Sequence, residues 1–188
     1  HRDLDLSLRR QRQMCIRDRF IEDRRIPNDN DIYLVNQFYS WTNNLVPNKF
    51  PTLDGDHPRM VIPFRDSKGD IFAYQGRAFG KEKPKYITII LDDSVPKIFG
   101  LDRVDTSRDI FVVEGPIDSL FIKNCIAVAQ SDLRVPQYKD KAILVPDNEP
   151  RNKEVIKQIE KAIDENYRVV VWPDCVRQKD INDMILSG

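Results

Sequence analysis

Acidic side chains stand directly after short apolar runs at two places in the second half of the chain. Glu114 follows IFVV, and Asp147 and Glu149 follow AILVP. Asp118 comes one helical turn after Glu114, so its side chain can point back towards the same edge. Carboxylates brought together repel one another unless a cation compensates, and Mg²⁺ binds to one or two carboxylates together with substrate phosphates. Glu114, Asp147 and Glu149 therefore predict a divalent metal site.

The same pattern also arises from helix caps and solvated loops, which is the ordinary interpretation of a single acidic residue after a strand. We favour that interpretation for Asp118, Asp174 or Asp183 taken alone. For the three predicted metal ligands together, metal binding is the better hypothesis.

Alternating strands and helices have to position these carboxylates. From Asp109 the chain reads as four apolar strands, IFVVEG, IAVAQ, KAILVPDNE and YRVVVWP, with helical segments at PIDSLFIKN, PRNKEVIKQIEKAIDEN and KDINDMIL. This alternation is typical of a parallel sheet with helices on both faces, whose sites lie at the carboxyl ends of the strands. The longest helix is expected to have an apolar inner face made by Val155, Ile156, Ile159 and Ile163.

The first half of the chain has β character. RMVIPFRDSKGDIFAYQGRAF predicts two strands around a turn at residues 66–69, and KYITIIL predicts a third strand. DIYLVNQFYSWTNNL predicts an amphipathic helix whose apolar side consists of Leu34, Val35, Phe38, Trp41 and Leu45. The expected fold class is α/β, with a small β-rich or α+β part ahead of the parallel sheet.

The N-terminal stretch RRQRQMCIRDR, residues 9–19, is interpreted as foreign to the protein. A basic run could neutralise phosphates, but this string resembles the translation of a widely used transposase sequencing adapter. We therefore exclude residues 1–19 as an artefactual or disordered N-terminus. They hold six arginines against Asp3, Asp5 and Asp18, a net charge of +3, which leaves −3 for residues 20–188 of a formally neutral chain. Nucleic acid would have to be held by a local basic surface or through metal ions.

Cysteine usage and hydropathy exclude other classes. Cys125 and Cys175, the two cysteines after residue 19, lack the CxxC spacing of a zinc site, so we expect no zinc site and no disulfide framework. No apolar run approaches the ~20 residues of a membrane span, so no membrane partner is expected. No GxxxxGK[ST] occurs, so any helicase activity would come from a separate partner.

Two motifs resemble the Toprim domains of primases, topoisomerases and some nucleases. IFVVEGPIDSL is similar to their EGxxD motif, and VPDNE to their DxD motif, with Asn148 and Glu149 in place of the usual glycine and second aspartate. Ahead of them, RMVIPFRDSKGDIFAYQGRAFGKEKPKYI and KIFGLDRV resemble the segments that precede Toprim in bacterial and phage primase cores. The run from DNEPRNKEV to KDINDMI is most like the primases of T-even-type bacteriophages. The resemblance covers residues 59–188.

This resemblance implies a Toprim domain over residues 107–188 and an N-terminal primase subdomain over residues 20–106. It implies an N-terminally truncated DNA primase, a nucleotidyltransferase that makes RNA primers on single-stranded DNA in phage replication. Its catalytic residues would be Glu114, Asp147 and Glu149. Mg²⁺ or Mn²⁺ would be bound by Glu114, Asp118, Asp147, Glu149 and Asp180. Nucleotide and template would be bound by Arg65, Arg77 and Lys85.

The same resemblance implies a single-stranded DNA template, ribonucleoside triphosphates and a replicative helicase as partners, in the cytoplasm of a host cell. Whether Glu114 is a metal ligand or a general base stays open. Two alternatives also stay open. One is a Toprim nuclease that uses the same carboxylates for hydrolysis, and the other is a non-catalytic Toprim module that binds single-stranded DNA or a helicase.

Overall fold

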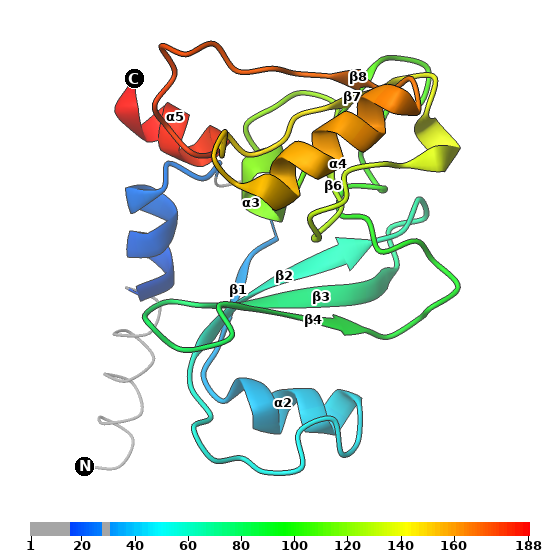
Figure 1. The fold of residues 1–188 in the computed structure, drawn as a ribbon. Helices are drawn as coiled ribbons and strands as arrows, with labels where there is room; N and C mark the ends of the chain where they lie inside the picture. Colours follow the sequence, from blue (N-terminus) through cyan, green and yellow to red (C-terminus); the bar gives the residue numbers. More distant parts are fainter. Residues whose placement is uncertain (1–15, 28–30) are drawn as a thin grey trace, which may run out of the picture.

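Two four-stranded sheets, one antiparallel and one parallel, form the frame of the molecule (Figure 1). The structure is a computed structural model, and it describes residues 16–27 and 31–188. The antiparallel sheet comes first in the chain and the parallel sheet second, as the change of sequence pattern predicts. Figure 1 shows the parallel sheet and its helices above the antiparallel sheet.

The antiparallel sheet has the strand order β1-β2-β3-β4. Its strands are β1 (Tyr33–Val35), β2 (Arg59–Arg65), β3 (Ile71–Ala78) and β4 (Tyr86–Ile90). The predicted turn at residues 66–69 is present, because Gly69 donates its backbone N–H to Asp66 O over 3.0 Å. Gly69 has a φ of +90°, which glycine adopts without strain. The three strands predicted for this half are confirmed.

The helix predicted for residues 31–45 is wrong in its first part. Residues Tyr33–Val35 form β1, which pairs with β2, and the helix α2 covers only Phe38–Leu45. Phe38 of α2 is fully buried and packs in an apolar cluster with Val61 and Tyr74 of the sheet. A Cβ on Gly76 of β3 would lie 2.4 Å from two atoms of the Phe38 ring, so this position requires glycine.

The parallel sheet has the strand order β6-β5-β7-β8, and all of its pairs are parallel. Its strands are β5 (Ile110–Val113), β6 (Cys125–Ala127), β7 (Ala142–Leu144) and β8 (Arg168–Val169). They are joined by the helices α3 (Pro116–Ser119), η1 (Pro136–Tyr138, a 3-10 helix) and α4 (Lys153–Asp164), and α5 (Ile181–Ser187) follows β8. The four predicted strands are confirmed.

Helices cover both faces of this sheet, as predicted. Ala162 of α4 packs with Ile110, Val112 and Leu144 on one face. Ile117 of α3 belongs to the apolar cluster on the other face, which contains Val113 and Ala127.

Two of the four residues predicted for the inner face of α4 face inward, and the other two are exposed. Val155, Ile159 and Ala162 border an apolar cavity beneath the helix, whereas Ile156 and Ile163 are 37% and 52% exposed. Each exposed isoleucine comes one residue after an inward-facing one, and one residue turns the side chain by about 100° around a helix with 3.6 residues per turn.

One apolar core joins the two sheets. Met60, Ile62 and Phe64 of β2 lie in the same buried cluster as Val113 of β5 and Ala127 of β6. The division expected between residues 106 and 107 falls in the segment that connects β4 to β5. The strands on either side of that division are thus held in a fixed relation by buried apolar side chains.

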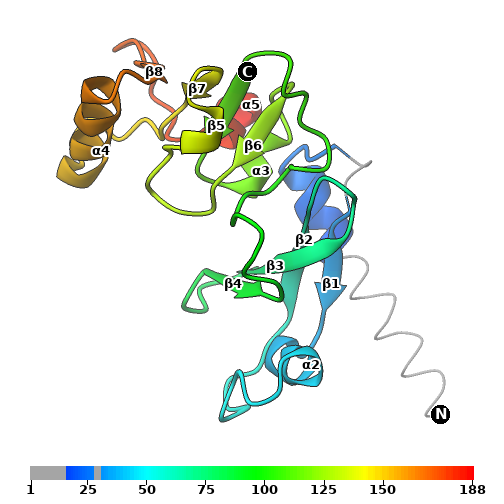
Figure 2. The same cartoon turned by 90° about the vertical axis from the view of Figure 1, so that its right-hand side faces the viewer.

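Residues 16–23 are helical and lie beside α5 (Figures 1 and 2). Arg24 Nη1 donates to Asn182 Oδ1 over 2.8 Å, and Asn182 Nδ2 donates back to Arg24 O over 2.8 Å. Residues 16–19, which we assigned to the excluded N-terminus, are therefore part of a helix, while residues 1–15 lie outside the described residues. In the described part of the chain, no helix has both the length and the apolarity to span a bilayer.

Candidate active site

The carboxylates that follow β5 and β7 meet at one edge of the parallel sheet. Glu114 directly follows β5, and Asp147 comes shortly after β7, which pairs with β5 in parallel register. Both line a cavity of about 340 Å³, together with Asp118 and Asp180. The topology thus brings Glu114, Asp147 and Asp118 to one place, as their positions after the strands predict.

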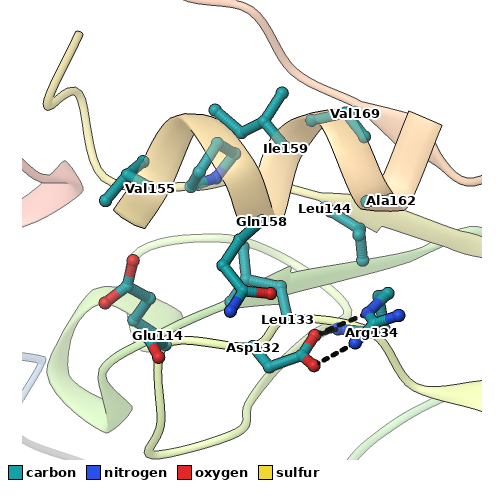
Figure 3. Close-up of a pocket in the computed structure, with 12 residues that line it drawn as sticks. Glu114, Asp132, Leu133, Arg134, Leu144, Val155, Gln158, Ile159, Ala162 and Val169 are labelled. Atoms are coloured by element: carbon teal, nitrogen blue, oxygen red, sulfur yellow. Dashed lines mark hydrogen bonds and ion pairs between the residues drawn. The ribbon is translucent and has the colours of Figure 1, made fainter. Parts of the chain in front are cut away.

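Glu114 lies between this polar cavity and an apolar one. Figure 3 shows its side chain at one end of a small cavity under α4, with the Asp132–Arg134 ion pair at the other end. Burial is the main cause that raises the pKa of Glu114 to about 7, and the negative charge of Asp147 adds to it. A carboxylate with such a pKa can gain and lose a proton near neutral pH.

Asp118 folds back against the start of its own helix. A Cβ on Gly115 would lie 2.8 Å from Asp118 Oδ2, so the glycine of EGxxD makes room for this carboxylate. Asp118 Oδ1 accepts a hydrogen bond from the backbone N–H of Asn182 over 2.9 Å, which ties α3 to α5. Burial, and then the nearby charge of Asp180, raises the pKa of Asp118 to about 6. Asp118 therefore has a structural contact as well as a place in the cavity.

The second acidic motif contains an internal cation that the sequence did not reveal. Lys179 Nζ lies 2.6 Å from Glu149 Oε1 and 3.5 Å from Asp147 Oδ2. The bonds from Lys179 and Asn152 lower the pKa of Glu149. Burial nevertheless raises the pKa of Asp147, because its desolvation outweighs the attraction of Lys179. The two carboxylates of this motif thus differ in environment.

The predicted metal ligands do not form one compact group. Among the residues that the structure describes, no three acidic, histidine or cysteine side chains are placed to hold a metal ion together. Asp180 Oδ1 accepts from the backbone N–H of Asp183 over 2.8 Å, so Asp180 is the N-cap of α5. The ammonium between Asp147 and Glu149, however, marks a place where this chain accommodates positive charge. The residues fit a Mg²⁺ ion bound by one or two carboxylates, with phosphates and water as its other ligands.

The three predicted basic residues lie in different surroundings. Lys85 is exposed and lines the same cavity as Glu114, and the neighbouring Tyr86 does so too. Arg65 forms an ion pair with Asp31 over 2.7 Å and lines another cavity. Of the predicted cations, Lys85 is the one placed at the carboxylates.

Arg77 is buried, with only 4% of its surface exposed. Its guanidinium carbon lies 4.4 Å from the centre of the Phe20 ring, and its Nε donates to the Tyr86 hydroxyl over 3.2 Å. An arginine that stacks on one aromatic ring and donates a hydrogen bond to the hydroxyl of another holds the second ring in one orientation. Arg77 therefore orients Tyr86 and does not itself line the cavity.

Two further residues were missed by the sequence analysis. Arg59 is fully buried, and its guanidinium donates to Gly76 O over 3.1 Å and to Pro84 O over 2.9 Å, which holds the loop that carries Lys85. Gln75 lines the cavity and donates to Thr88 Oγ1 over 3.3 Å. No sequence motif around either residue indicates its role, because the hydrogen-bond partners of each lie on other strands or loops.

Comparison with known proteins finds similar chains among DNA primases. No protein-family model matches the chain. The chain is 40% identical over 173 residues to the DNA primase of Enterobacteria phage T4, across 89% of this chain and 50% of that primase. The zinc-binding and RNA polymerase domains of the Aquifex aeolicus primase superpose with a TM-score of 0.64 at 20% identity, over 90% of this chain and 52% of that one. A DnaG primase catalytic domain bound to single-stranded DNA gives a TM-score of 0.64 at 16% identity, over 93% of this chain and 70% of that one.

The fold is thus that of a primase catalytic core, and the expected similarity to phage DNA primases is confirmed. The chain spans about half the length of the T4 and A. aeolicus proteins to which it is similar.

Proposed function

We propose that this chain is part of the catalytic core of a DNA primase, a metal-dependent nucleotidyltransferase that makes short RNA primers on single-stranded DNA. The observation that carries the proposal is the single cavity in which Glu114 and Asp147 of the parallel sheet face Lys85 and Tyr86 of the antiparallel sheet. A volume of about 340 Å³ suits a small organic ligand. Carboxylates for a metal and a lysine for phosphate are the groups that a nucleotide site needs.

The residues that line the cavity, and Glu149 beside it, would have different roles. Asp147, Glu149 and Glu114 would hold Mg²⁺ or Mn²⁺, which when bound stabilises the attacking and leaving oxygens of phosphoryl transfer. Lys85 would contact the phosphates as a point charge. The ring of Tyr86, oriented by Arg77, offers a face on which a base can stack.

In the alternative role, in which Glu114 does not hold the metal, it would instead take up the proton that the attacking hydroxyl loses, because its pKa of about 7 is close to the working pH. A general base is most effective when its pKa lies near that pH. Burial and the charge of Asp147 disfavour the ionised form of Glu114, so the carboxylate that remains near neutral pH is a stronger base than an ordinary one.

The partners proposed here are those that the similarity to DNA primases supports. Single-stranded DNA would be the template, ribonucleoside triphosphates the substrates and a replicative helicase the protein partner, in the cytoplasm of a host cell. A primase structure of this fold has been determined with single-stranded DNA bound, which supports the template.

A primer-extension assay with the whole chain tests the proposal. It supplies single-stranded DNA, labelled ribonucleotides, Mg²⁺ and a dinucleotide start. We expect wild type and the control Glu160→Gln, an exposed position on α4, to extend the dinucleotide and Glu114→Gln to lose extension. Extension at the wild-type rate by Glu114→Gln would contradict the assignment of this site. Shortened template without extension would identify a nuclease, and binding of DNA without either reaction would identify a non-catalytic module.

A further inference from the structure

The ammonium of Lys179 is held by both carboxylates of the second acidic motif. Its Nζ lies 2.6 Å from Glu149 Oε1 and 3.5 Å from Asp147 Oδ2. The other oxygen of Glu149 accepts from Asn152 Nδ2 over 2.5 Å. In this arrangement the lysine compensates one of the two negative charges of the motif from within the chain.

Asn148 fixes the loop that carries this lysine. Its backbone N–H donates to Lys179 O over 2.6 Å, and its side-chain Nδ2 donates to Val176 O and to Gln178 O, each over 3.0 Å. Asn148 stands between Asp147 and Glu149 in the sequence. The residue that separates the two carboxylates therefore also holds Lys179 opposite them. A glycine here, as in the motif that VPDNE resembles, would keep the backbone bond and lose the other two.

Lys179 can leave this position without disturbing the fold. Its side chain is 55% exposed and lines the same cavity as Lys85. A lysine side chain has a flexible stem, and its ammonium pairs readily with phosphate oxygens. A divalent cation and an ammonium repel each other strongly when both are bound to the same two carboxylates. Metal binding and the observed position of Lys179 therefore exclude one another.

We propose that Lys179 is an internal counter-ion that competes with the divalent metal for Asp147 and Glu149 and moves to the phosphates when a nucleotide enters the cavity. The inference rests on the proposed function, because it takes these carboxylates as metal ligands. Its consequence is that the nucleotide-free chain binds metal weakly. Metal and nucleotide then enter the site together.

The test measures binding of Mn²⁺ alone, by electron paramagnetic resonance at pH 8, to the whole chain without nucleotide. Lys179→Met is expected to bind Mn²⁺ about tenfold more tightly than wild type, the equivalent of one lost charge-assisted contact. Lys157→Met, at an exposed lysine of α4, is the matched control and should bind as wild type does. Adding Asp147→Asn to Lys179→Met should abolish the gain.

The outcomes separate this inference from the proposed function. If wild type and Lys179→Met bind Mn²⁺ with equal affinity, and Asp147→Asn abolishes Mn²⁺ binding in both, Lys179 does not compete with the metal. The assignment of Asp147 as a metal ligand would then still hold. No Mn²⁺ binding by either protein overturns both. In the extension assay, Lys179→Met should lower the Mg²⁺ concentration needed for half-maximal rate and raise the KM for ribonucleotide. An unchanged KM would overturn the movement of Lys179 to the phosphates.

The hydrogen bonds from Asn148 to the loop before and at Lys179 are called the Asn148 clamp here. A second variant tests the role of this clamp and keeps the lysine. Asn148→Ala removes the two side-chain bonds to the loop and leaves Lys179 in the chain. We expect Mn²⁺ binding to tighten in the same direction by a smaller factor, about two- to fivefold, since each neutral hydrogen bond contributes little net free energy. Weaker Mn²⁺ binding by Asn148→Ala would show that the clamp supports the metal site. It would overturn the inference that the clamp favours Lys179 over the metal.

Discussion

Replacing Glu114 by glutamine should stabilise the protein at high pH while it removes activity. The carboxyl of Glu114 has a pKa of about 7 in the folded chain and an ordinary value of 4.5, because burial and Asp147 disfavour its charged form. A difference of 2.5 pKa units corresponds to about 3 kcal/mol at 1.36 kcal/mol per unit. This free energy opposes folding once the carboxyl is ionised, and a neutral glutamine of the same shape avoids it.

The sign of the effect follows from proton binding. Between pH 4.5 and pH 7 the folded chain holds the Glu114 proton and the unfolded chain has released it, so the free energy of unfolding falls as the pH rises through this window. Below pH 4.5 both states are protonated, and Glu114→Gln should differ little from wild type. Above pH 7 both states are ionised, and the full difference appears.

Thermal unfolding at pH 5 and pH 8, without and with saturating Mg²⁺, measures this difference. At pH 8 without metal we expect Glu114→Gln to unfold roughly 6–12 °C above wild type, given about 2–4 °C per kcal/mol for a chain of this size. Saturating Mg²⁺ should raise the wild-type midpoint and narrow the gap, because a bound cation compensates the buried charge. If the two proteins differed by the same amount at pH 5 and pH 8, the charge of Glu114 would not be the cause of the difference.

Two further predictions concern the antiparallel sheet. Gly76→Ala should lower the free energy of unfolding in urea by about 1–3 kcal/mol, because its Cβ would lie 2.4 Å from atoms of the Phe38 ring; wild-type stability would mean that α2 moves away freely. Lys85→Ala should raise the KM for ribonucleotide by about 10- to 100-fold, the value of one charge-assisted contact, whereas Arg65→Ala should leave it unchanged because that arginine pairs outside the cavity. Steady-state extension kinetics of the two variants would contradict the assignment if both KM values rose equally.

The sequence predicted those parts of the fold that rest on a strong local pattern. The four apolar runs after Asp109 became the parallel sheet, and residues 59–90 became three antiparallel strands. It failed at β1, where Tyr33–Val35 continue a helical pattern but pair with β2. Three residues are too few to show the alternation of apolar and polar side chains that predicts a strand. Whether they form a strand depends on pairing with β2, which lies later in the chain.

The candidate site was predictable where it depends on strand ends and not where it depends on packing. Glu114 and Asp147 could be placed together because parallel strands end at one edge. The position of Lys179 depends on the Asn148 clamp, which is a tertiary contact without a local signal. The burial of Arg77 depends on Phe20, which is distant in the sequence.

The site is divided between the two sheets, so its geometry depends on the core that joins them. The carboxylates follow strands of the parallel sheet, while Lys85 stands just before β4 of the antiparallel sheet and is held there through Arg59. Met60 and Phe64 of β2 lie in one buried cluster with Val113, the residue directly before Glu114. Because buried side chains pack densely and transmit displacements, a shift in this cluster changes the distance between the cation and the carboxylates. Stability and the geometry of the candidate site are therefore coupled at this junction, because the same apolar contacts hold together the two sheets that line the cavity.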